Sequence, residues 1–279
     1  MRPEAEGQAS EVEVNVESPL TGEGGRPAGP QILTTPQTFL VTGGSRGIGA
    51  AVVERLAAAG RLVFLNYRNS QAEAMEVCER VRRAGGRVEP VQADVADRAA
   101  VVRMIGKVGE ASGRLDGFIH NAAAPLVPKR LMKLDWDSDV APQLSAAGCG
   151  FLNCIQAAGP LLQEGSRVVV VLTDALFHKP PVRMGAYLAA KGALWGLVRA
   201  AAKELQAQGV VVNTVSPGMT RTSLWRNYGD RALEILAGDH PLKRLARPEE
   251  VAAAIEWLAT GAPGYVHGSN LMVNGGTEF

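Results

Sequence analysis

The sequence predicts a single α/β domain built on a doubly wound parallel sheet of about seven strands. Short apolar runs alternate with longer helical segments along most of the chain. Parallel neighbours need crossover connections, and such alternating helices supply them. At 279 residues with 46% hydrophobic content, the chain is also long enough to bury one large core.

The alternation also places each element. Strands are expected at residues 38–42, 62–67, 88–92, 117–120, 167–172, 210–215 and 270–273. Helices are expected at residues 48–59, 72–84, 99–111, 142–162, 187–206 and 248–259, and residues 223–247 are expected to be irregular. Ligands of doubly wound sheets bind beyond the carboxyl ends of the strands, so the motifs described below should converge there.

Charge and cysteine usage narrow the class of protein. The 29 basic and 28 acidic residues leave a net charge of +1, which provides no broad attraction to nucleic acid or to an anionic membrane. The three cysteines Cys78, Cys149 and Cys154 lack CxxC or metal-ligand spacing, and the four histidines are scattered. We therefore expect reduced thiols, a cytoplasmic protein and no metal site.

Residues 1–36 differ from the rest in composition and are expected to form a flexible N-terminal extension before a domain at residues 37–279. The extension is rich in Gly, Pro, Ser and Glu and has no long apolar run, so neither a signal peptide nor a membrane span is expected. Within it, EVEVNVE at residues 11–17 alternates valine with polar residues. That pattern leaves open a strand that forms against a partner.

The run TFLVTGGSRGIG at residues 38–49 is typical of a strand, a tight turn and a helix that receives phosphate. Its glycines, Gly43, Gly47 and Gly49, allow a tight turn, a close approach of the backbone to a ligand and close packing of the helix on the strand. The start of the helix offers free N–H groups and a positive dipole end to phosphate oxygens. The spacing is GxxxGxG, which fits the general dinucleotide fingerprint only loosely.

Four motifs in order carry a family resemblance. They are TGGSRGIG, the Asn-Ala pair at Asn121, the YxxxK pattern of Tyr187 and Lys191, and SPGMTRT at residues 216–222. In this order they resemble the short-chain dehydrogenases/reductases, from about Gln37 to Phe279. The resemblance implies a Rossmann-type fold and hydride transfer with a nicotinamide dinucleotide. It implies cofactor contacts from Gly43, Ser45, Arg46, Gly47, Ile48, Gly49, Arg68, Asn69, Ser70, Asp94, Val95, Asn121, Ala122, Tyr187, Lys191, Pro217, Gly218, Thr220 and Thr222.

The end of the second strand predicts which dinucleotide is used. An acid there would accept from a ribose 2′-hydroxyl and repel a 2′-phosphate, but LVFLNYRNS at residues 62–70 contains none. Arg68 can instead pair with a phosphate, Asn69 and Ser70 can donate to it, and Arg46 is a second cation. The sequence therefore predicts NADPH/NADP+ as the cofactor.

Tyr187 and Lys191 are the predicted catalytic pair. Their spacing of four places both side chains on one face of a helix, where a lysine ammonium would lower the pKa of a neighbouring phenol. The family resemblance makes Tyr187 the proton donor to a substrate oxygen and lets Lys191 hold the nicotinamide ribose.

Three positions depart from the family pattern. Asp174 stands thirteen residues before Tyr187, where the family has a serine, with Thr173 beside it as an alternative hydroxyl. We predict Asp174 as a catalytic residue that acts through a protonated carboxyl or a water, as the aspartate of the related pteridine reductases suggests. Ala146 replaces the asparagine of the family's proton relay, and HNAA at residues 120–123 replaces the usual NNAG.

The predicted activity is NADPH-dependent reduction of a carbonyl, with a ketone, a β-ketoacyl thioester or a polyketide-like intermediate as substrate, small or carrier-bound. Two alternatives remain open at this point. One is a pteridine-like reductase of C=N or C=C bonds, and the other is a non-catalytic NADP(H)-binding sensor or scaffold. Trp225 is either a substrate wall or simple packing. The many Ala and Gly residues of helices 142–162 and 187–206 indicate a homodimer or homotetramer.

Overall fold

The computed structural model describes residues 36–178, 180, 182–225 and 229–277. Apart from Pro36, the predicted flexible extension at residues 1–36 lies outside the described residues, as does the alternating stretch 11–17. Both interpretations stay predictions.

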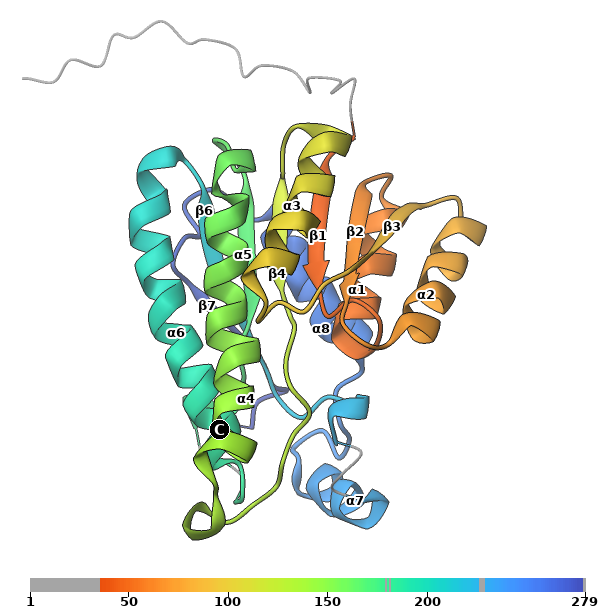
Figure 1. Cartoon of the computed structure of the whole chain (residues 1–279). Coiled ribbons are helices and arrows are strands. Elements are labelled where there is room, and N and C mark those ends of the chain that lie inside the picture. Colours follow the sequence, from red (N-terminus) through yellow and green to blue (C-terminus); the bar gives the residue numbers. More distant parts are fainter. Residues whose placement is uncertain (1–35, 179, 181, 226–228, 278–279) are drawn as a thin grey trace, which may run out of the picture. The chain divides into compact units, whose positions relative to one another are not determined.

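A seven-stranded, all-parallel sheet forms the centre of the domain, as the sequence predicts (Figure 1). Its order is β3-β2-β1-β4-β5-β6-β7, so the chain moves outward in one direction from β1 and in the other direction from β4. The strands are β1 (Thr38–Thr42), β2 (Leu62–Tyr67), β3 (Arg87–Gln92), β4 (Gly117–His120), β5 (Arg167–Val171), β6 (Val211–Pro217) and β7 (Asn270–Val273). The reversal at β1 and β4 is the switch point at which doubly wound sheets bind ligands.

Helices cover both faces of the sheet (Figure 1). One face packs against α1, α2 and α8, and the other against α3, α5 and α6. The helices are α1 (Gly47–Ala58), α2 (Gln71–Arg83), α3 (Arg98–Ser112), α4 (Ala141–Leu144), α5 (Gly150–Ala158), α6 (Gly185–Leu205), α7 (Asp230–Asp239) and α8 (Pro248–Glu256).

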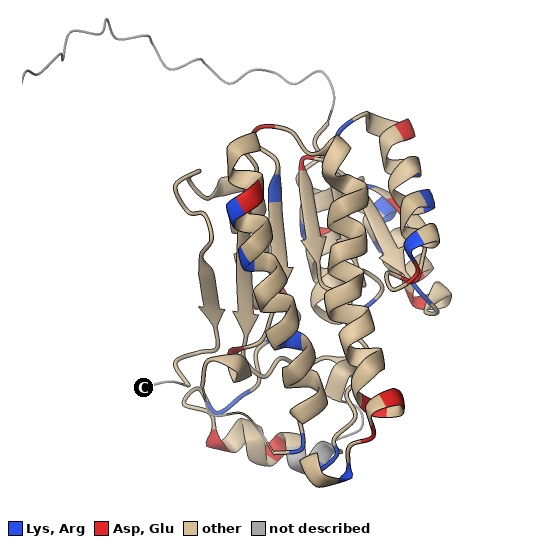
Figure 2. Cartoon of the chain, turned by 60° about the vertical axis from the view of Figure 1, so that its left-hand side comes forward, with Lys and Arg blue, Asp and Glu red and all other residues tan. Residues whose placement is uncertain are grey.

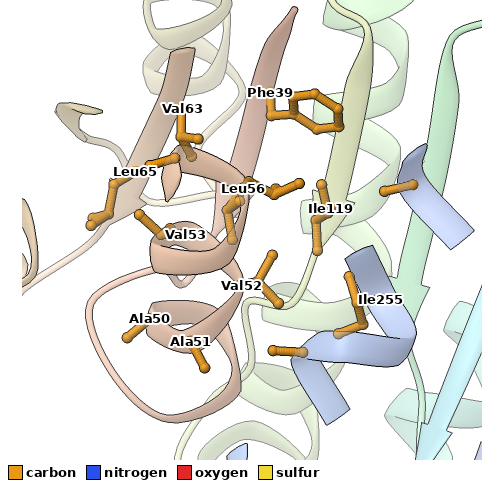
Figure 3. Close-up of a cluster of buried hydrophobic side chains, with 14 of the residues drawn as sticks. Phe39, Ala50, Ala51, Val52, Val53, Leu56, Val63, Leu65, Ile119 and Ile255 are labelled. Atoms are coloured by element: carbon orange, nitrogen blue, oxygen red, sulfur yellow. The ribbon is translucent and has the colours of Figure 1, made fainter. Parts of the chain in front are cut away.

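Strand side chains alternate between the two cores, because successive residues of a strand point to opposite faces. Phe39 packs in the core that contains Leu56 of α1 and Ile255 of α8, whereas its neighbour Leu40 packs in the core of α3, α5 and α6 (Figure 3). All five residues of β1 are buried. A strand buried on both faces needs a continuous apolar run, which explains why the central strands are readable in the sequence.

Two expectations about helices are wrong. Residues 142–162 do not form one α-helix, because a π-helical segment, Ser145–Cys149, separates α4 from α5, and a 3₁₀ turn follows at Gly159–Leu161. Residues 223–247 are not irregular throughout, because they contain α7. Its sequence DRALEILAGD is rich in good helix formers, and Leu233 gives it an apolar contact with the rest of the domain.

Candidate functional site

The glycine turn after β1 is closed so tightly that only glycine fits. Gly43 and Gly47 have φ of +65° and +55°, in the left-handed region. A Cβ on Gly49 would lie 2.2 Å from the carbonyl oxygen of Gly43. The first turn of α1 contains no acid, and the side chain of its N-cap residue, Arg46, makes no capping bond. The first N–H groups of α1 are therefore free to receive an anion.

A cavity of about 490 Å³ opens beside this turn, and we call it the large cavity to distinguish it from an adjoining one of about 90 Å³ described below. It runs from the start of α1 past the ends of β2 and β3 to the residues after β4. The structure brings thirteen of the predicted cofactor residues to its wall: Gly43, Ser45, Arg46, Gly47, Ile48, Arg68, Asn69, Ser70, Asp94, Val95, Asn121, Ala122 and Thr222. The volume, the free helix start and the glycine cradle fit a dinucleotide.

The arginines predicted to choose the cofactor both line the large cavity. Arg46 donates from Nη2 to Ser70 Oγ at 2.9 Å, and Arg68 pairs with Asp94 at 3.4 Å. The Arg68 side chain is 51% exposed, so this ion pair is screened by water and leaves the guanidinium available to a ligand. Sequence reasoning missed Glu73, a carboxylate in the first turn of α2 that lines the same cavity. Its place one helical turn after Ser70 was the available signal.

The residues after β4 form a fixed floor for the large cavity, despite the departure from the family pattern there. The backbone N–H groups of Asn121 and Ala122 donate to Thr42 Oγ1 at 3.1 and 3.2 Å. The Asn121 side chain donates to the carbonyl oxygens of Thr42 and Gly43 at 3.2 and 3.0 Å. The floor and the glycine turn are therefore held as one unit.

A smaller cavity of about 90 Å³ contains the predicted catalytic residues, and we call it the tyrosine cavity. Asp174, Tyr187, Lys191, Pro217, Gly218 and Thr220 line it. Ile48, Asn121 and Thr222 line both cavities, so the two adjoin. Gly49 is the one predicted site residue that lines neither of them. It lies within the turn itself.

Tyr187 and Lys191 are both buried near the start of α6, as their spacing predicts. Lys191 Nζ donates to the carbonyl oxygen of Val171 at 2.6 Å and lies 5.9 Å from the centre of the Tyr187 ring. Burial raises the pKa of Tyr187 to about 12 and lowers the pKa of Lys191 to about 8. Loss of hydration dominates at both groups, so the net shift of the phenol pKa is upward although Lys191 lies nearby.

Thr173 is the hydroxyl residue beside Tyr187 in the tyrosine cavity. Thr173 is 7% exposed and lies in extended conformation directly after β5, and its hydrogen bond to the phenol opposes the rise in the pKa of Tyr187. Asp174 starts the next 3₁₀ turn, and its Oδ2 accepts from Thr277 Oγ1 at 3.5 Å. The position thirteen residues before Tyr187 is Asp174, and the hydroxyl residue beside the phenol is its neighbour Thr173.

The roof of the tyrosine cavity is apolar. Trp225, 8% exposed, packs in one cluster with Tyr187, Leu126 and Met184. Trp225 and Met184 also line the tyrosine cavity, so Trp225 is both a wall of the cavity and part of the packing around it. Leu233 brings α7 into contact with this cluster. Sequence reasoning missed Met184, for which no motif exists.

In the described part of the chain, no helix is long and apolar enough to cross a membrane. No group of three or more His, Cys, Asp or Glu in that part could hold a metal ion. Cys78 and Cys154 are buried free thiols, and Cys149 is an exposed one.

Comparison with known proteins identifies the family. The sequence profile described as Enoyl-(Acyl carrier protein) reductase matches residues 43–278. A 3-oxoacyl-(acyl-carrier-protein) reductase of Staphylococcus aureus is 32% identical over 243 residues, which are 86% of this chain and 97% of the relative. A reductase of the same name from Synechocystis is 35% identical over 248 residues, which are 87% and 97% of the two chains.

A solved structure agrees with these relatives. The short-chain dehydrogenase of Burkholderia cenocepacia in complex with NADP superposes with a TM-score of 0.80 at 33% identity, covering 86% of this chain and 97% of that one. The chain belongs to the short-chain dehydrogenase/reductase family. It is an oxidoreductase with a nicotinamide cofactor.

Proposed function

We propose that the chain is an NADPH-dependent reductase that converts a ketone, foremost a β-ketoacyl thioester, into the alcohol. One observation carries the proposal. The buried phenol of Tyr187 lies beside Thr173 in a cavity that adjoins the dinucleotide-sized large cavity. Its pKa of about 12 keeps it protonated at neutral pH, which is the state a proton donor needs.

The residues of the two cavities divide the work. NADPH would supply a hydride, with its pyrophosphate at the start of α1 and its 2′-phosphate near Arg46 and Arg68. Thr173 and Tyr187 orient the substrate's carbonyl oxygen. As the carbonyl carbon gains the hydride, Tyr187 gives its proton to that oxygen, so that ketone, hydride and proton make the alcohol. The Lys191 ammonium stabilises the phenolate that remains.

The lining of the tyrosine cavity favours an uncharged carbonyl with apolar neighbours. Trp225 and Met184 offer only apolar surface, while Asp174 would repel a carboxylate next to the reacting carbon. Among the described lining residues, the only base is Lys191, which is engaged with Val171. A β-ketoacyl thioester meets these conditions, and the curated relatives named above carry 3-oxoacyl reductase names.

The test is NADPH oxidation with a panel of acetoacetyl and longer β-ketoacyl thioesters, simple ketones and free acetoacetate. We expect turnover of the thioesters and at least about tenfold lower kcat/KM for the free acid, because Asp174 faces it. The matched control is Tyr187→Phe, which removes the proton donor and keeps the ring. Tight NADPH binding without turnover of any carbonyl would overturn the proposal.

A second candidate is reduction of a conjugated C=C or C=N bond. Asp174 at the tyrosine cavity favours it, because a carboxyl can protonate the carbon or nitrogen end of such a bond. The same assay with crotonyl thioester and a dihydropterin separates this activity from ketone reduction. A non-catalytic sensor would turn over none of these compounds, and the buried Tyr187 and Lys191 pair argues against it.

We also propose a homodimer or homotetramer that associates through α5 and α6. α5 contains no charged residue, and α6 contains four: Lys191, Arg199, Lys203 and Glu204 (Figure 2). Leu152 of α5 is 39% exposed, so this helix presents an apolar side chain at the surface of the chain. Light scattering at micromolar concentration tests this, and a monomer mass would exclude the assembly.

A further inference from the structure

His120 is a buried titratable group to which the proposed reaction gives no task. It is the last residue of β4 and is 0% exposed. Its ring packs against those of Phe118 and Phe151, with ring centroids 5.9 and 5.6 Å away. A buried polar ring must be hydrogen-bonded at both nitrogens to be tolerated there, and the partners it uses indicate its role.

The hydrogen bond to Ala147 determines which ring nitrogen of His120 carries the proton. Nε2 lies 3.2 Å from the carbonyl oxygen of Ala147, which can only accept, so Nε2 carries the proton. Nδ1 then offers a lone pair to the hydroxyl of Thr42, 3.3 Å away, whose single proton is shared between Nδ1 and the carbonyl oxygen of Ile119 at 3.4 Å. Burial and the charge of Lys191 lower the pKa of His120 to about 3, so the ring stays neutral and keeps this tautomer.

The two ends of this chain of hydrogen bonds lie at the large cavity. At one end, Thr42 Oγ1 accepts from the backbone N–H groups of Asn121 and Ala122, which form the floor. At the other end, Ala147 belongs to the π-helical segment Ser145–Cys149, whose Ala146 lines the same cavity. Single π-helical turns inside α-helices occur frequently at functional sites.

We propose that His120 is a positioning residue that ties the floor of the large cavity to the π-helical segment, and so holds the two walls in register for hydride transfer. The proposal rests on the reductase function above. Two departures from the family pattern lie at this link: His120 in HNAA forms it, and Ala146 at the relay position directly precedes Ala147 in the π-helical segment. The strand thus supplies a side-chain link in a region where the helix has lost its amide.

The test uses two amide variants that each keep one half of the link. In His120→Gln the amide reaches about as far as Nε2 and can still donate to Ala147. In His120→Asn it reaches only about as far as Nδ1 and keeps Thr42 alone. Because residue 120 is joined through the backbone to Asn121 of the floor, the bond to Ala147 is the half that reaches the π-helical segment. We expect His120→Gln, which keeps that bond, to stay within a few fold of the unmodified kcat, and His120→Asn, which loses it, to lose roughly ten- to hundredfold with the KM for NADPH little changed. Thermal unfolding of both variants is the control for stability.

Two readouts do not depend on turnover. Hydrogen exchange in His120→Asn should accelerate at residues 120–123 and 145–149 and elsewhere remain as in the unmodified chain. In the unmodified protein, ¹⁵N chemical shifts of His120 should report the proton on Nε2. If the carbonyl panel shows no turnover but these readouts hold, the reductase proposal fails and the link stands.

Other outcomes overturn the link itself. A proton on Nδ1 in the unmodified chain does so without any variant. Equal kcat for His120→Asn and the unmodified enzyme also does so. If both variants lose the same thermal stability while kcat per folded enzyme is unchanged, His120 is a packing residue only.

Discussion

The two cavities of this enzyme are built from different parts of the chain. The tight parts of the large cavity are made of backbone: the glycine turn, the free N–H groups of α1 and the peptides after β4. The tyrosine cavity is made of side chains from five separate segments, with Ile48, Thr173, Tyr187 and Trp225 as examples. Backbone sites depend on glycine spacing and are visible as motifs, whereas side-chain sites depend on which neighbours the fold brings together.

The electrostatics of the two cavities differ in the same way. Arg46 and Arg68 at the large cavity make solvent-exposed hydrogen bonds, where water and salt screen their charges. Tyr187 and Lys191 are buried, and burial is the main cause that moves their pKa values to about 12 and about 8. A single substitution in the tyrosine cavity should therefore lower activity by a larger factor than a single substitution in the large cavity.

The largest expected effect is at Tyr187. Tyr187→Phe keeps the ring in its apolar cluster and removes the only proton the phenol can donate. We expect turnover to fall at least ~10²-fold while the dissociation constant of NADPH is little changed. Stopped-flow reduction and a fluorescence titration measure the two quantities. Retained turnover would mean that another group donates the proton.

The next largest effect is expected at Thr173, and it decides whether Thr173 or Asp174 orients the substrate. Thr173→Val removes the hydroxyl that bonds the phenol and should cost roughly ten- to hundredfold in kcat, while Thr173→Ser restores most of it. For Asp174, we expect Asp174→Asn to retain more activity than Asp174→Ala, and Asp174→Ser to be active. If Thr173→Val leaves kcat unchanged and Asp174→Ala lowers kcat ten- to hundredfold, the carboxyl of Asp174 orients the substrate instead.

Local patterns predicted the sheet and the large cavity because each of their parts is encoded in adjacent residues. The limits of β1, β2, β4 and β7 agree with the structure, since each is an apolar run with clear ends. Thr173 could not be assigned in this way, because its bond to Tyr187 depends on where β5 ends relative to α6. The π-helical segment has no sequence signal of its own. The helix α7 was not predicted because the residues around it, aromatic and polar, favour an irregular stretch.

A smaller effect is expected at the large cavity, on the choice of cofactor. Arg46→Ala and Arg68→Ala should each lower the preference for NADPH over NADH by about tenfold, the low end for charge-assisted contacts because both groups are exposed. Glu73→Gln is the matched opposite change and should raise that preference, because a carboxylate on the same wall repels the 2′-phosphate. Equal dissociation constants of the unmodified chain for the two dinucleotides would contradict the interpretation.

The smallest effect within the working range is on the pH profile, and it tests whether Lys191 or Asp174 controls the tyrosine cavity. The pKa of Lys191 is lowered to about 8, so its ammonium is present below that pH and is lost as the pH rises through it. Tyr187, with a pKa of about 12, stays protonated throughout. We therefore expect kcat/KM for reduction, which reports the free enzyme, to be level in neutral solution and to fall to about half near pH 8.

Two variants decide the origin of that fall. Lys191→Arg replaces the ammonium by a cation that does not titrate, so the fall near pH 8 should disappear whatever the residual rate. Asp174→Asn should leave the fall in place. A reaction that needs a protonated Asp174 would instead lose rate as the pH rises through the pKa of that carboxyl, and Asp174→Asn would abolish that loss. Such a profile would show that Asp174, the residue at which this chain departs from its family, and not Lys191, sets the pH dependence of the reaction.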